Sequence, residues 1–163
     1  MKEPIEIDEK SYKGQKIGST LIRRLLENGD VSEVSELLGR PYSLDGFVTH
    51  GRGRGKTIGL PTANIAPKYP YKIPKSGVYV VRVYHEDSVL YGICNIGHNP
   101  TFNYNANMSI EVNILDFAED IYGDYLGIEF IERVRDEIKF AGIDQLLEQI
   151  AKDKEYARRI IMK

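Results

Sequence analysis

Short runs of strand-forming residues, separated by turn-forming residues, constrain the fold of this chain more than any other feature. From about Tyr42 to Arg133, runs rich in Val, Ile, Phe and Tyr alternate with clusters of Gly, Pro, Asn and Asp. The expected strands cover residues 47–49, 78–84, 89–96, 108–115 and 126–134. Several short strands at this spacing favour an antiparallel barrel or sandwich, so we predict a mainly β fold.

Three helical patterns flank the strand region. Ser19 and Thr20 precede a short apolar run that ends before Gly29, which predicts a capped helix. A second short helix is expected between a box-like start at Asp30-x-x-Glu33 and Gly39. A last helix is predicted from about Asp144, with a surface Glu148–Lys152 pair and apolar positions at Leu146, Leu147, Ile150, Ala157, Ile160 and Ile161.

Composition indicates a compact soluble domain. The 163 residues are 42% hydrophobic and 28% charged, which suits one ordinary domain with a core. The one cysteine, Cys94, lies in an apolar run and is interpreted as a buried thiol; it excludes an internal disulfide and a cysteine zinc site. His50, His85 and His98 show no metal-ligand spacing, so no chemistry is assigned to them.

The sequence contains no membrane or export signal. No apolar run approaches the length of a membrane span, and the start Met1-Lys2-Glu3-Pro4 lacks the apolar stretch of a signal peptide. We therefore expect a cytoplasmic protein without a membrane partner.

Charge is distributed unevenly although the net charge is only −2. Residues 46–85 contain no Asp or Glu, while seven cations fall there: Arg52, Arg54, Lys56, Lys68, Lys72, Lys75 and Arg82. From Glu111 onward most of the acids appear, and these would repel a nucleic-acid backbone. The balance favours a compact anion such as ATP over a nucleic acid.

A cationic glycine loop runs from Gly51 into the turn Pro61-Thr62-Ala63-Asn64. Closely spaced glycines let backbone N–H groups face phosphate oxygens, and Thr62 and Asn64 add uncharged oxygens suited to Mg²⁺. A Walker A loop is excluded because His50 stands where its first glycine is required, and no G-x-G-x-x-G spacing occurs. Taken alone, the loop is equally typical of a flexible surface segment or a weak nucleic-acid contact.

Glu111 is the candidate for acid–base chemistry. Strand alternation places Ile110, Val112 and Ile114 on one face and Ser109, Glu111 and Asn113 on the other. If the apolar face packs in the core, Glu111 faces a site. Without further information, a lone strand glutamate is more often simply solvated.

His50 to Ile65 closely resembles the nucleotide-binding segment of riboflavin kinases, a glycine-rich arch followed by Gly-x-Pro-Thr-Ala-Asn. The similarity covers about residues 40 to 160. It continues in the family's order through Gly77-Val78-Tyr79, Asn95-Ile96-Gly97, Pro100-Thr101-Phe102, Glu111, Leu115-Asp116-Phe117, Tyr122-Gly123 and Arg135-Asp136-Glu137-Ile138-Lys139-Phe140. The resemblance implies a Greek-key-type antiparallel barrel with a C-terminal helix and two short N-terminal helices.

The resemblance also implies an activity and its residues. Glu111 aligns with the family's general base, which acts on the ribityl 5′-hydroxyl during transfer of the ATP γ-phosphoryl group. Thr62 and Asn64 would hold Mg²⁺ and, with Gly51, Lys56 and Tyr122, bind ATP. Arg135 would contact the flavin, and residues 135–140 would form a mobile flap over the isoalloxazine ring. The alternative interpretation is that Arg135 is an exposed surface residue beside Asp136 and Glu137. The roles of Arg52 and Arg54 stay open.

The N-terminal segment has a resemblance of its own. Ile17 to Arg23 and Leu38 to Tyr42 look like the end of the adenylyltransferase module of bacterial bifunctional FAD synthetases. The nucleotide-binding half of that module is missing. We therefore expect residues 1–39 to be a helical remnant that behaves as ordinary packing, residues 40–163 to be the riboflavin kinase domain, and FMN adenylyltransferase activity to be absent.

Two other classes of function remain open. One is a non-catalytic flavin- or nucleotide-binding module, although an intact Thr62, Asn64 and Glu111 argue against a retired site. The other is a small RNA-binding barrel, which clustered aromatics on one sheet face would support. Five tyrosines instead lie beside prolines or in apolar runs, where core and loop packing is the simpler interpretation: Tyr69, Tyr71, Tyr79, Tyr84 and Tyr91.

Overall fold

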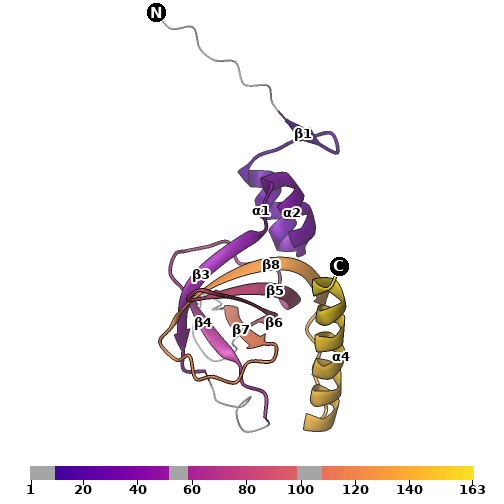
Figure 1. Cartoon of the computed structure of the whole chain (residues 1–163). Coiled ribbons are helices and arrows are strands. Elements are labelled where there is room, and N and C mark those ends of the chain that lie inside the picture. Colours follow the sequence, from indigo (N-terminus) through magenta and orange to yellow (C-terminus); the bar gives the residue numbers. More distant parts are fainter. Residues whose placement is uncertain (1–9, 52–58, 99–107) are drawn as a thin grey trace, which may run out of the picture.

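The computed structural model of the chain describes residues 10–51, 59–98 and 108–163, and it shows a barrel with helices at one end and along one side (Figure 1). Its elements are β1 Ser11–Tyr12, β2 Gln15–Lys16, α1 Ser19–Asn28, α2 Val31–Leu38, β3 Tyr42–Thr49, β4 Ala63–Pro67, β5 Gly77–His85, β6 Ser88–His98, β7 Met108–Ile114, β8 Tyr125–Arg135 and α4 Ile143–Ile161. Strands β1 and β2 form a separate hairpin.

Six strands close into a barrel in the order β3-β4-β7-β6-β5-β8, with every neighbouring pair antiparallel. The predicted mainly β barrel is therefore confirmed. Strand β4 was not expected, because its sequence Ala-Asn-Ile-Ala-Pro carries turn-forming residues. It is held by pairing with β3 on one side and with β7 on the other.

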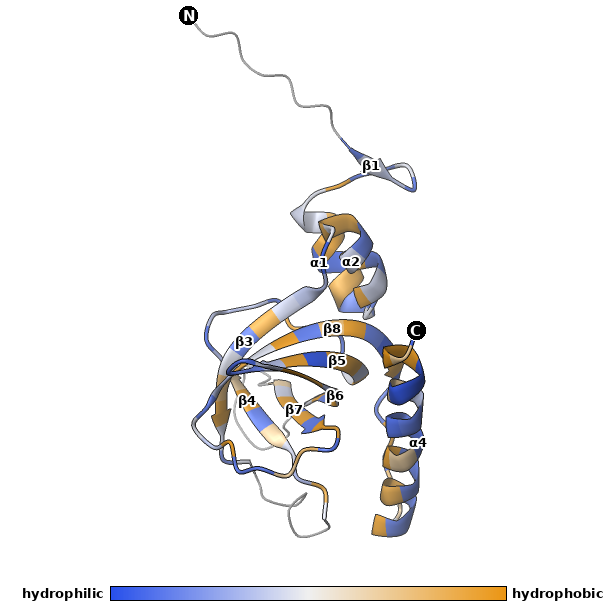
Figure 2. Ribbon diagram, viewed as in Figure 1, coloured by the Kyte–Doolittle hydropathy of each residue, from blue (hydrophilic) through white to orange (hydrophobic). Residues whose placement is uncertain are grey.

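Hydrophobic and hydrophilic residues alternate along the strands (Figure 2), and the buried apolar side chains fill the barrel. The interior includes five residues with no exposed surface: Leu44, Tyr79, Val112, Ile128 and Phe130. Cys94 belongs to the same interior, as predicted for a structural thiol. Burial in this apolar core raises the pKa of the Cys94 thiol, and the nearby charge of Glu111 raises it further.

Helices α1 and α2 belong to the apolar core of the barrel. Leu25, Leu26, Val31 and Val34 are buried in one cluster with the barrel interior. Both helices end at glycines in the left-handed region, Gly29 with φ 85° and Gly39 with φ 70°, as the sequence predicted. The expected side-chain caps are not formed: α1 begins after Gly18, and Asp30 makes no capping hydrogen bond.

Helix α4 packs along the outer face of the barrel (Figure 1). Ala157, Ile160 and Ile161 join a second apolar cluster with Val80 and Ile93 of the sheet. Further toward its start, Leu146 and Ile150 line a cavity instead. The predicted Glu148–Lys152 pair is present at 2.8 Å. No helix among the described residues is long and apolar enough to cross a membrane.

Candidate active site on the outer face of the barrel

A row of polar residues crosses four neighbouring strands. Thr49 of β3 pairs with Asn64 of β4, Asn64 pairs with Glu111 of β7, and Glu111 pairs with Asn95 of β6. The strand neighbours of these residues, such as Val112, are buried in the core. Alternation therefore directs the whole row to the outer face, which agrees with the orientation predicted for Glu111.

One end of this row opens into a cavity of about 510 Å³ with a lining that is part polar and part apolar; we call it the polar cavity because the predicted phosphate-side residues line it. Five of the predicted site residues line it together: Gly51, Thr62, Asn64, Glu111 and Tyr122. They come from the end of β3, the start of β4, the middle of β7 and the loop before β8. Lys56, Arg52 and Arg54 lie outside the described residues.

A second cavity of about 310 Å³ lies between the sheet and α4. Its apolar lining comes from Leu60, Val78, Ile93, Ile138, Phe140, Leu146 and Ile150. Arg135 lines it as well, while Thr62 and Glu111 line both cavities. A polar compartment and an apolar compartment therefore meet at a carboxylate and a hydroxyl.

Gly51 and Asn64 approach each other closely in the polar cavity. A Cβ placed on Gly51 would lie 1.9 Å from Nδ2 of Asn64, far inside van der Waals contact. The resemblance predicts Gly51 on the phosphate side of the site. Its position shows a further reason for a glycine, because any larger residue would displace the Asn64 amide.

His50 joins the site although no chemistry was assigned to it from the sequence. Its ring stacks on the ring of Tyr122, with centroids 3.5 Å apart and planes within 14°. Both residues line the polar cavity. A flat aromatic pair at the edge of a cavity is a surface on which a planar ring can stack. No spacing pattern could have found the pair, because its members lie far apart in the sequence.

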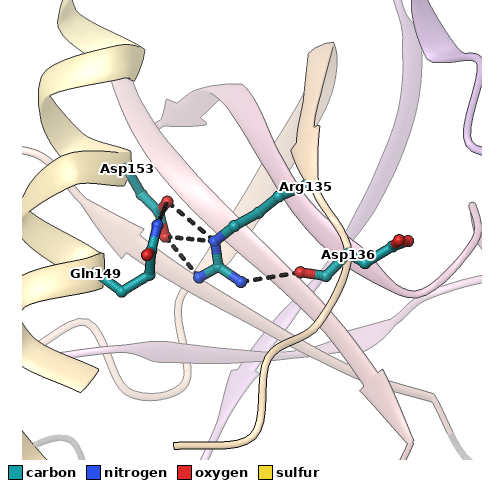
Figure 3. Close-up of polar contacts among 4 residues, drawn as sticks. All are labelled: Arg135, Asp136, Gln149 and Asp153. Carbon is teal, nitrogen blue, oxygen red and sulfur yellow. Dashed lines mark hydrogen bonds and ion pairs between the residues drawn. The ribbon is translucent and has the colours of Figure 1, made fainter. Parts of the chain in front are cut away.

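Arg135 is held by an ion pair with α4 (Figure 3). Its Nε donates to both carboxylate oxygens of Asp153 at 3.0 and 3.1 Å, and Nη2 donates to Oδ2 at 2.6 Å. The amide nitrogen of Gln149 donates to the same carboxylate of Asp153. Nη1 of Arg135 donates to the backbone oxygen of Asp136. The side chain of Asp153 is only 3% exposed. Arg135 is thus no solvated surface arginine, although it still lines the apolar cavity.

A model of the riboflavin kinase family (Flavokinase) matches residues 38–161, which is most of the chain. The chain belongs to the riboflavin kinase family. It is 45% identical to the bifunctional riboflavin kinase/FMN adenylyltransferase of Bacillus subtilis over 94% of its own length and 49% of that protein. The corresponding protein of Listeria monocytogenes is 42% identical over 96% of this chain and 50% of its own length. The chain thus spans about half the length of these relatives.

Solved structures agree with the fold. A Streptococcus pneumoniae structure described as a macrolide-efflux protein matches with a TM-score of 0.87 and 37% identity, over 93% of this chain and 50% of its own. The riboflavin kinase of Trypanosoma brucei matches with a TM-score of 0.54 and 22% identity, over 76% of this chain and 81% of its own, which supports the barrel fold alone.

The donor set in the polar cavity suits a magnesium ion that is held mainly by phosphate oxygens. In the parts of the chain that the structure describes, no cluster of three His, Cys, Asp or Glu side chains could hold a metal by itself. Thr62 and Asn64 provide neutral oxygens beside Glu111 in the same cavity. Mg²⁺ usually keeps several waters and takes few protein ligands, so these residues fit it.

The cations of the acid-free segment are partly neutralised in space. Lys72 pairs with Glu27 at 2.7 Å, and Arg82 pairs with Glu129 at 2.9 Å. The acids come from α1 and β8, outside the segment. The attraction for anions that the sequence predicted for this whole segment is therefore weaker at these positions.

Exposed aromatic side chains other than Tyr122 gather away from the candidate site. Phe47 and Tyr125 form an edge-on pair with ring centroids 5.2 Å apart, and Tyr69 is 55% exposed. The expectation that the tyrosines serve core and loop packing fits Tyr79 in the core and Tyr69, whose exposed ring packs edge-on against Tyr71 in its loop. Tyr125 donates to Asp45 at 2.7 Å, which raises the pKa of its hydroxyl to about 12. Such carboxylates beside the rings disfavour an RNA backbone.

Proposed function

We propose that this chain transfers the γ-phosphoryl group of ATP to the ribityl 5′-hydroxyl of riboflavin, which gives FMN. The observation that carries the proposal is the meeting of a polar and an apolar cavity at Thr62 and Glu111. A phosphate donor and a flat apolar acceptor need separate compartments that share one reaction point. Membership of the riboflavin kinase family supports the same pair of substrates.

Glu111 acts as the general base in this proposal. Its carboxylate accepts the proton of the 5′-hydroxyl while the hydroxyl oxygen forms a bond to the γ-phosphorus and the bond to the ADP oxygen breaks. The strand β7 fixes its position, because Glu111 pairs with Asn64 on one side and Asn95 on the other. No covalent enzyme intermediate is required.

The polar cavity binds ATP. Gly51 leaves room for the Asn64 amide, Thr62 and Asn64 supply oxygens toward a bound magnesium ion, and Tyr122 with His50 offers a stacking surface for the base. Magnesium, when bound, neutralises charge on the phosphate oxygens. Lys56 is proposed to contact the phosphates from the glycine-rich loop.

The apolar cavity binds the isoalloxazine ring. Val78 and Ile93 form its wall on the sheet, and Leu146 and Ile150 form the facing wall on α4. Arg135 contributes a guanidinium at the edge, where the ion pair with Asp153 fixes its plane. Residues 136–140 lie over this cavity, with Ile138 and Phe140 in its lining, and would act as the flap.

We also propose that residues 1–39 correspond to the adenylyltransferase side of the bifunctional relatives and serve as packing for the kinase domain of residues 40–163. The match covers about half of those relatives, and the family model covers residues 38–161.

The decisive test compares FMN formation from riboflavin and Mg-ATP by the natural chain and by Glu111→Gln. We expect activity in the natural chain and a loss of roughly 100-fold or more in the variant. Glu155→Gln is the matched control, because Glu155 is exposed on α4 and lines neither cavity. Its activity should equal that of the natural chain.

Two results would contradict the proposal in different ways. A folded natural chain that binds riboflavin without phosphorylating it would favour a non-catalytic flavin-binding module. A Glu111→Gln variant with unchanged turnover would show that another group removes the proton.

A further inference from the structure

The loop between β7 and β8 forms one wall of the polar cavity. Every residue from 117 to 122 lines that cavity, and Tyr122 at the end of this run stacks on His50. Residues 117–121 lie in neither a helix nor a strand. No ladder of backbone hydrogen bonds fixes this stretch, so its position depends on side-chain contacts and on the way its two ends are held.

His85 of β5 contacts the loop at both ends. Its Nε2 lies 2.8 Å from Oδ2 of Asp124, and its ring meets the ring of Phe117 edge-on, with centroids 6.0 Å apart. An ionised carboxylate can only accept, so Nε2 of His85 donates this hydrogen bond. The residue is 7% exposed and lines neither cavity of the candidate site. A buried histidine outside the site thus holds the loop that forms the wall of the site.

Asp124 connects this contact to the aromatic stack. The backbone N–H of Val48 donates to the backbone oxygen of Asp124 at 2.8 Å, and the N–H of Gly123 donates to the oxygen of Val48 at 2.9 Å. Val48 lies in β3, two residues before His50. Asp124 lies two residues after Tyr122. The segment that the buried histidine fixes therefore sets the two stacked rings opposite each other.

Other contacts keep the loop folded when this hydrogen bond is absent. Ile121 is 7% exposed and belongs to the barrel core, which anchors the loop at one point. The side chain of Asp124 is 43% exposed, so its truncation to alanine leaves neither a buried cavity nor a buried charge. An Asp124→Ala chain should therefore fold, with the loop attached to the barrel but less well fixed.

We propose that His85 is a positioning residue for the nucleotide. Through Asp124 and Phe117 it holds the loop wall of the polar cavity in the place where the ring of Tyr122 is ready to stack on the base. This inference rests on the proposed function, in which that cavity binds ATP. A wall that is fixed before binding loses less conformational entropy when the nucleotide binds, so the affinity is higher.

The experiment measures KM for ATP by steady-state kinetics and the dissociation constant of Mg-ADP by calorimetry in Asp124→Ala and His85→Leu. Both quantities should rise roughly 10-fold, because a charge-assisted hydrogen bond is lost and the loop must be ordered on binding. The value of kcat at saturating substrates should stay within roughly 2-fold of that of the natural chain. The dissociation constant of riboflavin should be unchanged, since neither residue lines the apolar cavity.

Three further variants separate positioning from a general structural role. His85→Gln places an amide nitrogen near the position of Nε2 and should bring KM for ATP to within roughly 3-fold of the natural value. The double variant should be no worse than His85→Leu alone, because both changes remove the same hydrogen bond. Asp87→Ala is the matched control: it removes an exposed carboxylate two residues from His85 that lines neither cavity, and it should leave KM for ATP unchanged.

The outcomes distinguish this inference from the proposed function. If Asp124→Ala binds Mg-ADP as tightly as the natural chain, the positioning role is wrong and the kinase assignment stands. The same conclusion follows if Asp124→Ala weakens riboflavin and Mg-ADP equally and lowers stability in urea, because that pattern belongs to a general loss of structure. If the natural chain forms no FMN, the kinase assignment is wrong, and the dissociation constants of Mg-ADP decide the role of His85. If the natural chain does not bind Mg-ADP, both are overturned.

Discussion

At the scale of single residues, the close approach of Gly51 to Asn64 makes a specific prediction. In Gly51→Ala the new methyl group would fall 1.9 Å from the present position of Nδ2, so the amide must move. We expect KM for ATP to rise roughly 10-fold or more, because a small displacement of a positioning group has a large effect on transfer. Steady-state kinetics with Mg-ATP as the varied substrate measures it.

The control for Gly51→Ala is Gly18→Ala. A Cβ at Gly18 meets nothing within 4 Å, so kinetics and stability should stay close to those of the natural chain. The dissociation constant of riboflavin should be unchanged in both variants, since Gly51 does not line the apolar cavity. An unchanged KM for ATP in Gly51→Ala would show that Asn64 is not required for nucleotide binding.

Cys94 leads to a prediction about pH. Burial raises the pKa of its thiol, so the folded chain keeps the proton at a pH where the unfolded chain, near the ordinary thiol pKa of about 8.5, releases it. The stabilisation that the buried, protonated thiol gives the folded chain is complete below the thiol pKa of the unfolded chain and falls as pH rises above that pKa. Between pH 7.5 and 9.5 we expect a loss of about 1 kcal/mol.

The measurement is urea unfolding at both pH values, with Cys94→Ala as the reference for all other titrating groups. The pH-dependent loss should be smaller in Cys94→Ala by the stated amount. A thiol reagent should label the natural chain only after unfolding, because Cys94 is 0% exposed. Rapid labelling of the folded chain at pH 7.5 would contradict the assignment.

The local sequence predicts some of the site and misses the rest for physical reasons. Alternation in β7 is enough to direct Glu111 outward, because a strand has only two faces. It cannot show that Asn113 on the same face is buried, since that depends on Pro61 and α4 covering it. The stack of His50 on Tyr122 likewise exists only after distant segments meet.

At the scale of elements, α4 is fastened to the barrel by one buried and one exposed ion pair. The buried pair joins Asp153 to Arg135, and the exposed pair joins Arg158 to Asp116, whose side chain is 72% exposed. Tyr156 also donates to Glu132 of β8. The helix therefore holds one wall of the apolar cavity in a fixed position.

We predict that Asp153→Ala lowers the free energy of unfolding by about 3 kcal/mol, because it leaves the guanidinium of Arg135, whose side chain is only 18% exposed, without its carboxylate partner. Arg158→Ala removes the exposed pair from the same helix and should cost at most about 1 kcal/mol. Urea unfolding of the two variants measures the difference. Equal small losses would show that the buried pair contributes no more than a surface one.

Strand β4 shows where prediction of elements from sequence stops. Its five residues include Asn64 and Pro67, which local propensity assigns to a turn, and its two neighbours in the barrel come from before and after it in the chain. The longer strands and the helices carry enough apolar periodicity to be recognised. The order of strands around the barrel is set by long-range pairing, which periodicity does not encode.

At the scale of the whole molecule, the candidate site exists only in the closed barrel. The polar cavity combines the end of β3, the start of β4 and the middle of β7, while the apolar cavity adds β8 and α4. Riboflavin and ATP would therefore bind to parts of the chain that are remote in sequence. The site therefore forms only when the barrel folds.

The N-terminal helices α1 and α2 are part of the folded core that the site requires, and this leads to the last prediction. Leu21, Leu25, Leu26, Val31 and Val34 are buried with the barrel interior, and the backbone N–H of Lys75 donates to the oxygen of Leu26 at 2.9 Å. Removal of residues 1–39 exposes their contact surface. Side chains of this size contribute on the order of 10 kcal/mol together, which is comparable with the whole stability of a typical domain.

We therefore expect residues 40–163 alone to be unfolded or far less stable in circular dichroism and urea titrations, even though a domain boundary was predicted at residue 39. A chain that begins at Ile17 is the matched control. It loses the β1–β2 hairpin, whose contacts with α1 and α2 include the exposed Lys13–Glu33 ion pair, hydrogen bonds of Tyr12 and Gln15, and partial packing of Tyr12 on the core. Its stability should stay within about 2 kcal/mol of the full chain. A stable, active 40–163 fragment would instead show that α1 and α2 are dispensable, and the predicted boundary would then also be a structural one.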